Sequence, residues 1–476
     1  MAKFVVIGGS ISGLLASISL SRQGHEVKIV DPTASNTDLD LEKRFSSRQK
    51  GMAQRHHSHA FLAKLRNILR SNFPDILDAL LDAGAFEMPF MEFLPETILQ
   101  KNSEPDDVDL VGIGARRTTF ETVILGIAQK ESGIDFIAGE ILGLVASKNT
   151  CNPTKIRGVR TKNGDEILGD LVIDCSGRNS ERNKWLENLE LRGETIEESP
   201  CPIQYLTRFY KLPSSALFPE PDGRFAGDFG YIKVGIFPAD NGFFSTTVGL
   251  NDRDKQLKGL KNPEAFDRAM LAFEHTGKWL RIKDVKPITN VEVMTKLKNR
   301  RRRPVTLNQD GSLVGLIALG DSLMHTNPLY GRGCTISSMQ AQELPKIIDR
   351  SNDETQLIEN WNAYVGKEIF PYYDMAVFQD AQDFMTGENG GTPPKGSLSY
   401  VIKEGVVPAS YVDAGVYRAF IKAFNLIGGP FDLLSDPEVL ATINKTISKR
   451  ESNTWQLPDP FGPAHDELVK LIENSL

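Results

Sequence analysis

Cysteine is scarce in this 476-residue sequence, and no two of the four cysteines form a Cys-x-x-Cys pair. The sequence therefore shows neither a zinc-knuckle nor a dithiol motif, and a disulfide framework is not expected at this length. Positive charge is not in excess, because the formal net charge is −7, so nothing indicates a nucleic acid or an anionic membrane as partner. Runs of about 18 apolar residues are absent, so no membrane span is expected.

A strand-turn-helix-strand pattern is present near the start, in VVIGGSISGLLASISLSRQGHEVKIVD at 5–31. The pattern predicts a buried strand, a glycine turn, a helix over 11–23 and a second strand. In the dinucleotide-binding fingerprint, three glycines allow a tight turn, close approach to a pyrophosphate and close helix packing, and a final acid accepts ribose hydroxyls. The helix N-terminus attracts phosphate. The expected nucleotide contacts are Gly8, Ser10, Ile11, Ser12, Gly13 and Asp31, with Ser10 in place of the second glycine.

A second stretch of this kind, VGLIALGDSLMHTNPLYGRGCTISSMQAQEL, occupies 314–344. A carboxylate at a strand end accepts ribose or ribitol hydroxyls, and glycines at a helix start expose N–H groups to an anion such as reduced flavin. The helix is expected from Cys334. The first stretch alone could be a bare structural turn and does not distinguish NAD from FAD, but two distant sites suit one long cofactor, which favours FAD. The expected contacts here are Asp321, Pro328, Gly331, Gly333 and Cys334.

These motifs resemble the FAD-dependent monooxygenases of the aromatic-hydroxylase fold, the p-hydroxybenzoate hydroxylase-like enzymes. RRTTFE at 116–121 and DLVIDCSGRNSERNKWL at 170–186 resemble further segments of that family, in family order. KGMAQRHHSH at 50–59 resembles a bacterial subgroup that includes polyether epoxidases. The resemblance implies additional contacts to FAD, which map to Arg48, Gln54 and Arg117.

The resemblance also implies an α/β fold, with a Rossmann-like (GR2-type) FAD-binding domain, an inserted antiparallel β-sheet substrate domain and a mainly helical C-terminal region. PIQYLTRFYKL alternates with period two, and GYIKVGIFPADNGFFSTTVGL predicts a hairpin about Asp-Asn-Gly. We expect helices over 263–276, 338–350, 354–383 and 411–425, and a loop over 384–397. The expected FAD-binding domain comprises 1–185 and 304–345, the substrate domain 186–303 and the helical region 346–476.

The activity implied by the resemblance is monooxygenation, in which reduced flavin adds O2 at C4a and passes the distal oxygen to an electron-rich ring or alkene. A hydrophobic organic molecule of secondary metabolism is the implied substrate, hydroxylation and epoxidation both stay open, and no catalytic residue is assigned. Ser176 stands where single-component members have an aspartate linked to FAD and NADPH. NADPH or NADH could therefore act directly or through a separate flavin reductase. A strand from Phe4 leaves no room for a signal peptide, so a cytoplasmic protein is expected, and a homodimer stays open.

Three other classes of protein compete with this interpretation. Flavin halogenases share the fold, but their W-x-W-x-I-P signature is absent, and no tryptophan lies between Trp185 and Trp279. Prenyl or alkene reductases of the geranylgeranyl type carry Y-x-W-x-F-P where this sequence has YIKVGIFPAD, with Lys233 in place of the tryptophan. A binding protein on a decayed flavin fold is disfavoured, because the glycines and acids of both stretches are present.

Histidines lie close to two of the motifs. A metal site is disfavoured for the first three, because no nearby carboxylate or cysteine completes a ligand set. The resemblance implies a flavin-loop role for them, and proton transfer by one of them stays open. The histidine after Asp321 is expected to face substrate or to be a hydrogen-bonded loop residue. These residues are His56, His57, His59 and His325.

Two further segments have a marked composition. RRRR at 300–303 is interpreted as a solvated surface run rather than a phosphate site. VYRAFIKAFNLIGGPFDLL at 416–434 is partly amphipathic, and core or dimer packing is favoured over docking on a membrane.

Overall fold

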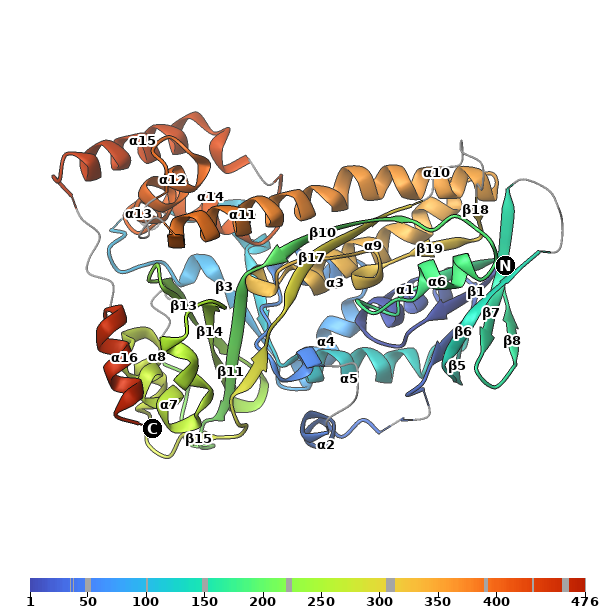
Figure 1. Cartoon of the computed structure of the whole chain (residues 1–476), viewed down its shortest axis with the longest axis horizontal. Helices are drawn as coiled ribbons and strands as arrows, with labels where there is room; N and C mark the ends of the chain where they lie inside the picture. Colours follow the sequence, from blue (N-terminus) through green and yellow to red (C-terminus); the bar gives the residue numbers. More distant parts are fainter. Residues whose placement is uncertain are drawn as a thin grey trace.

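A computed structural model gives the structure of the chain. Among the residues it describes, five parallel strands form a sheet in the order β19-β9-β1-β2-β5 (Figure 1). The strands are β1 (Lys3–Ile7), β2 (Glu26–Asp31), β5 (Ile134–Ala138), β9 (Leu171–Asp174) and β19 (Leu316–Ala318). The described residues are 1–34, 36, 38–47, 53–99, 102–147, 153–219, 225–304, 313–388, 393–429, 432–455 and 462–475.

The first strand is buried on both faces of this sheet. Phe4 and Val6 belong to a core shared with helices α1, α5 and α9, whereas Val5 and Ile7 belong to a core shared with strands β6 and β7. This confirms the buried strand that the continuous apolar run predicts, because a strand covered on both sides needs apolar residues at every position. The elements that cover it are α1 (Ile11–Ser21), α5 (Arg117–Ala128), α9 (Arg332–Asp349), β6 (Ile141–Ala146) and β7 (Thr154–Thr161).

A second, antiparallel sheet has the order β12-β13-β14-β11-β15, with β16 also paired to β11. The predicted hairpin is confirmed, because β13 and β14 are joined at Asp240–Gly242, where Asn241 and Gly242 have positive φ. One face of this sheet packs against α7, α8 and α16, and the helix expected over 263–276 is divided between the first two. The bounds are β11 (Ile203–Lys211), β12 (Ala226–Asp228), β13 (Ile232–Pro238), β14 (Phe243–Asn251), β15 (Lys286–Pro287), β16 (Glu292–Met294), α7 (Pro263–Ala272), α8 (Glu274–Leu280) and α16 (His465–Glu473).

Long strands β10 (Thr195–Cys201) and β17 (Leu297–Arg303) run between the two sheets, and β17 also pairs with β20 (Met324–His325) (Figure 1). The four arginines at 300–303 form the last part of β17. The expectation that they lie on the solvated surface is wrong for the two central ones. Arg301 and Arg302 are 7% and 3% exposed. Glu197 of β10 lies opposite Arg301 and forms an ion pair with it, whereas Arg302 donates a hydrogen bond to the backbone oxygen of Ser180.

The C-terminal part is mainly helical, as expected. Helices α10 (Glu354–Tyr364) and α11 (Phe370–Glu388), joined by a π-helical turn, run along β10 and β17 to a group formed by α12 to α15 (Figure 1). Because α11 continues to Glu388, the expectation of a loop over 384–397 is wrong for residues 384–388. In the described part of the chain, no helix is long and apolar enough to cross a membrane. The group comprises α12 (Leu398–Val401), α13 (Val407–Ser410), α14 (Ala414–Phe424) and α15 (Pro437–Glu451).

Candidate functional site

The candidate site lies at the carboxyl ends of the parallel strands, where ligands bind in open α/β sheets. Gly8 follows β1, Asp31 ends β2, Asp174 ends β9 and Gly320 follows β19 after one residue. Because the strands are parallel, these four positions from three distant parts of the sequence meet at one edge of the sheet.

The glycine turn after β1 has the geometry that the fingerprint predicts. Gly8 has a φ of +103°, and a Cβ there would lie 2.6 Å from the carbonyl oxygen of Cys175. A Cβ at Gly13 would lie 1.9 Å from the carbonyl oxygen of Gly8, so α1 packs too closely for any side chain. Ser10 has a φ of −100°, which any L-residue adopts, and this explains why the second glycine is dispensable.

Asp31 is held in place by the turns that flank it. Its Oδ2 accepts the N–H of Gly9 at 2.8 Å, and its Oδ1 accepts the N–H and hydroxyl of Thr33 at 2.7 and 2.6 Å. The carboxylate is therefore oriented beside the N-terminus of α1, and it retains acceptor capacity for a ribose diol.

The second nucleotide-type stretch packs directly on the first. The hydroxyl of Ser12 donates to that of Ser337 at 2.8 Å, and a Cβ at Gly320 would lie 2.3 Å from Oγ of Ser12. Gly331 has a φ of +64° and caps a helix that begins at Arg332. The helix start expected at Cys334 is therefore two residues late, and Gly333 and Cys334 lie inside its first turn, where N–H groups have no partner within the helix.

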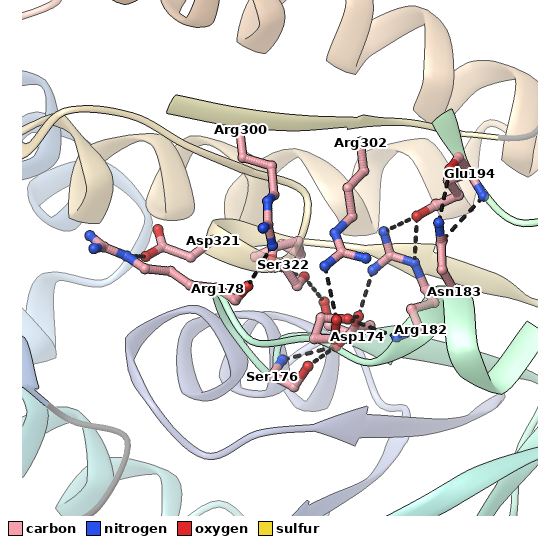
Figure 2. Close-up of polar contacts among 12 residues, drawn as sticks. Asp174, Ser176, Arg178, Arg182, Asn183, Glu194, Arg300, Arg302, Asp321 and Ser322 are labelled. Carbon is pink, nitrogen blue, oxygen red and sulfur yellow. Dashed lines mark hydrogen bonds and ion pairs between the residues drawn. The ribbon is translucent and has the colours of Figure 1, made fainter. Parts of the chain in front are cut away.

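Asp321 forms an ion pair with Arg178, whose Nε donates to Oδ2 at 3.1 Å (Figure 2). Burial raises the pKa of Asp321, but the charges of Arg178 and His325 outweigh it, so the pKa lies below its usual value. His325 contacts the backbone oxygen of Asp321 at 3.2 Å and lines the cavity described below, so both roles expected for it are compatible with its position.

A buried carboxylate, Glu121 of α5, gathers three groups around it. Its Oε1 accepts Nε of Arg117 at 2.8 Å and the hydroxyl of Ser10 at 3.0 Å, and its Oε2 accepts Nη2 of Arg55 at 3.3 Å. Burial raises the pKa of Glu121, but Arg117 and Arg55 more than compensate, so its pKa is lowered. The arginine expected to contact FAD is thus anchored to the fingerprint loop through one carboxylate.

The three clustered histidines take separate partners. Nδ1 of His57 lies 3.0 Å from Oγ1 of Thr207, Nδ1 of His59 lies 2.9 Å from the carbonyl oxygen of His57, and Nε2 of His56 lies 2.5 Å from that of Phe45. Burial lowers the pKa of His57 to about 4 and that of His59 to about 3. Both rings are therefore neutral at neutral pH and are weak proton acceptors there.

Ser176, which stands where single-component enzymes have an aspartate, is turned back onto Asp174. Its N–H and hydroxyl donate to Oδ1 of Asp174, while Ser180 and Arg182 donate to Oδ2 (Figure 2). Arg302 of β17, a strand that runs between the two sheets, donates a hydrogen bond to the carbonyl oxygen of Ser180 and so fixes this loop (Figure 2). The carboxylate of Asp174 is therefore occupied within the protein.

A second buried network holds the turn before α9. The side chain of Asn327 accepts from the hydroxyl of Tyr205 and from the N–H of Leu329, and it donates to Asp380 of α11 at 2.7 Å. Asn299 of β17 donates to the other oxygen of Asp380 at 2.7 Å. The antiparallel sheet and a C-terminal helix thereby position the turn that begins at Pro328.

A cavity of about 2980 Å³ adjoins both nucleotide-type turns, with Asp31 and Asp321 on its wall. Because single-ligand pockets usually measure about 300–1,000 Å³, this volume suits a long cofactor together with a substrate. Gly13 lies behind the cavity wall, Arg48 is outside the described residues, and the side chain of Gln54 is not described. The expected contact residues that line it are Gly8, Ser10, Ile11, Ser12, Asp31, Arg117, Asp321, Pro328, Gly331, Gly333 and Cys334.

Several residues that the sequence interpretation missed also line this cavity. Arg55, Arg178 and Arg332 are among them, and single arginines give no signal in a sequence without their partners. The segment 416–434 packs in the core, as expected, but α14 also turns Phe420 and Phe424 to the cavity. Its aromatic content was the signal that could have indicated a binding wall.

Comparison with known proteins establishes the fold. No protein-family model matches the sequence. A curated relative, Protein Rv3254 of Mycobacterium tuberculosis, is 21% identical over 408 residues, which are 79% of each chain.

Three solved structures are similar to the chain. PqsL, described as a probable FAD-dependent monooxygenase from Pseudomonas aeruginosa, has a TM-score of 0.57 at 14% identity and covers 88% of this chain and 99% of its own. The Diels-Alderase PyrE3 of pyrroindomycin biosynthesis has a TM-score of 0.55 at 15% identity, over 90% and 81%. The flavin-dependent brominase Bmp2 has a TM-score of 0.50 at 15% identity, over 99% and 97%. The chain thus has the fold of FAD-dependent monooxygenases of the aromatic-hydroxylase type.

Proposed function

We propose that this protein is an FAD-dependent monooxygenase that transfers one oxygen atom of O2 to a hydrophobic aromatic or alkene substrate. The observation that carries the proposal is the meeting of two nucleotide-type turns, far apart in the sequence, on one cavity. Each turn brings a carboxylate and a helix N-terminus, with Asp31 beside α1 and Asp321 before α9. The fold shared with PqsL supports the same activity.

The residues present fit FAD. Asp31 would hold the ribose of the adenosine, and the N-terminus of α1 would hold the pyrophosphate. Asp321 would accept a ribityl hydroxyl, and the N–H groups of Gly333 and Cys334 would face the negative edge of reduced flavin. Gly8 leaves bare backbone on the cavity wall, where a side chain would collide with Cys175.

When bound, FAD supplies the oxygen chemistry, and the protein supplies position and shielding from water. One oxygen atom enters the substrate and the other leaves as water, with two electrons from NAD(P)H. Phe237 of β13 and Thr247 of β14 line the cavity from the sheet face opposite to the helix-covered core and would hold the substrate. His57 and His59, with pKa values of about 4 and about 3, are weak proton acceptors at neutral pH, so no general base is assigned to them. No acid is assigned, which suits a substrate that is already electron-rich.

The source of electrons is either NADPH or NADH bound by this chain, or a separate flavin reductase. Because Ser176 donates two hydrogen bonds to the carboxylate of Asp174, we infer that neither side chain contacts the reductant unless these hydrogen bonds rearrange. A cytoplasmic location, a homodimer and a division of the chain at 185, 303 and 345 stay predictions.

Two alternative functions use the same fold. A halogenase is favoured by the likeness to Bmp2 but opposed by the missing tryptophan signature. A prenyl or alkene reductase is opposed by Lys233, which forms an ion pair with Asp228 on the neighbouring strand instead of presenting an aromatic ring. Both alternatives retain FAD, so product analysis and not cofactor content distinguishes them.

The test is the visible spectrum of the purified protein, followed anaerobically as NADPH or NADH is added. A flavin spectrum that bleaches supports a self-sufficient enzyme, and one that bleaches only after a flavin reductase is added supports the partner. Oxygen uptake with incorporation of labelled oxygen into product separates monooxygenation from bromination, which needs halide, and from alkene reduction, which needs no oxygen. A colourless protein that takes up no added FAD would refute the proposal.

A further inference from the structure

Arg332 is a buried cation that has no counter-ion among the residues that the structure describes. It is the first residue of α9 and lines the cavity, yet its side chain is only 6% exposed. Its Nε and Nη1 are enclosed, and among the described residues neither has a hydrogen-bond partner. Two guanidinium nitrogens are therefore desolvated without a compensating hydrogen bond from the described residues, at a helix N-terminus that adds further positive potential.

The other cations described on the cavity wall all have partners. Arg253 and Lys403 also make interactions within the protein. Arg332 therefore differs from these cations in having no acidic partner among the described residues, and this leaves its charge for an anionic ligand. The ion pairs are those of Arg55 and Arg117 with Glu121, Arg178 with Asp321, Lys233 with Asp228, and Arg450 with Glu404.

Burial without a partner is costly, and it is tolerated at sites where a ligand supplies the missing charge. Burial lowers the pKa of Arg332, but the ordinary value for arginine is so high that the group stays charged at neutral pH. A planar guanidinium binds a carboxylate through two parallel hydrogen bonds. Because the other cations described on this wall are engaged, a singly charged carboxylate matches the site better than a phosphate.

The surroundings of Arg332 are aromatic and apolar. Its guanidinium carbon lies 4.5 Å from the centre of the Tyr330 ring. Tyr330 contacts Phe424 of α14, which contacts Phe420, with ring centres 6.3 Å apart in each pair. All four residues line the cavity. A charged group therefore stands at one end of an aromatic wall that the C-terminal helices provide.

We propose that Arg332 binds a carboxylate of the substrate, whose apolar body lies along Phe424 and Phe420. The inference rests on the proposed function for the identity of this ligand as the substrate. It narrows the substrate class from hydrophobic molecules in general to amphiphilic carboxylates with an aromatic or alkenyl body.

The test uses two probes of equal apolar shape, para-butylbenzoate and para-butylbenzyl alcohol, titrated calorimetrically into the FAD-loaded protein. We expect the carboxylate to bind at least about tenfold more tightly than the alcohol. Equal affinities in the wild-type protein would overturn the proposal without any need for a variant.

Variants then assign the preference to one residue. Arg332→Met should remove the preference for the carboxylate, and Arg332→Lys should retain part of it, because one ammonium replaces the two-pronged contact. Arg450→Met is the matched control, because it removes a cavity-lining cation that is already paired with Glu404, and it should keep the preference. A preference that persists in Arg332→Met would overturn the assignment.

The two proposals fail in different ways. A flavoprotein that shows no preference between the probes refutes the carboxylate site and leaves the monooxygenase intact. A protein that takes up no FAD but shows a preference that depends on Arg332 refutes the cofactor and leaves the anion site. If Arg332→Met loses FAD while its preference for the carboxylate persists, the guanidinium serves the cofactor, and the substrate proposal is wrong.

Discussion

Ser10 donates its hydroxyl to Oε1 of Glu121 at 3.0 Å, so the side chain at the second glycine position is bonded to a buried carboxylate of the protein. The serine that replaces the second glycine of the fingerprint therefore has its hydrogen-bond partner in α5, more than a hundred positions later in the sequence. It leaves the N-terminus of α1 on the cavity wall, where the sequence places a phosphate.

Ser10→Gly should change FAD affinity by less than about threefold, because glycine at a helix start costs only a few tenths of a kcal/mol relative to serine. Loss of the bond to Glu121 should lower the free energy of unfolding by about 1 kcal/mol. FAD titration by fluorescence quenching and urea unfolding measure the two effects. A loss of affinity beyond tenfold would show that the hydroxyl contacts the nucleotide, contrary to this geometry.

Glu121→Gln should lower the free energy of unfolding by about 3–5 kcal/mol, because it leaves buried Arg55 and Arg117 without a carboxylate. The control is Glu166→Gln, which breaks a surface pair with Arg160 in which both side chains are roughly half exposed, and it should cost less than about 1 kcal/mol. Urea unfolding compares the two variants. Equal losses would mean that the carboxylate does not hold the two arginines.

Asp321→Ala should weaken FAD binding by about tenfold to a hundredfold, the value of a charged hydrogen bond to a hydroxyl. The measurement is the FAD content after gel filtration, together with the dissociation constant. Asp75→Ala is a suitable control, because Asp75 is half exposed and pairs with Arg22 at a distance from the cavity lining. Unaltered FAD content in Asp321→Ala would remove Asp321 from the site.

The stability of the protein should depend on pH through His57. Burial lowers the pKa of His57 from 6.5 to about 4, so between these values the unfolded chain binds a proton that the folded protein does not. The free energy of unfolding should therefore fall as the pH falls through this window, by up to about 1.4 kcal/mol per pH unit from this group. Urea unfolding between about pH 5 and 7 should show a smaller slope for His57→Gln. An identical slope would mean that His57 titrates normally.

Much of the local structure could be predicted from residues close together in the sequence. The strand at Phe4, the helix of the first unit and the hairpin at Asp240 all follow from short-range patterns, and the structure confirms them. The loop expected over 384–397 was wrong for residues 384–388, and the surface position expected for 300–303 was wrong for Arg301 and Arg302. Composition alone does not show that α11 continues, nor that acids of β10 lie opposite the arginines of β17.

The sequence by itself determined the two nucleotide-type turns and their order, because glycine φ angles, strand burial and helix starts depend on neighbouring residues. Only the tertiary structure decided that these turns share one cavity, that Ser10 is hydrogen-bonded to Glu121 and that Arg332 has no acidic partner in the described part of the chain and lies beside an aromatic wall. Each of these facts depends on segments brought together from distant parts of the chain. Burial and pairing, which set the charge and the chemistry of a side chain, are properties of that assembly and not of any one segment.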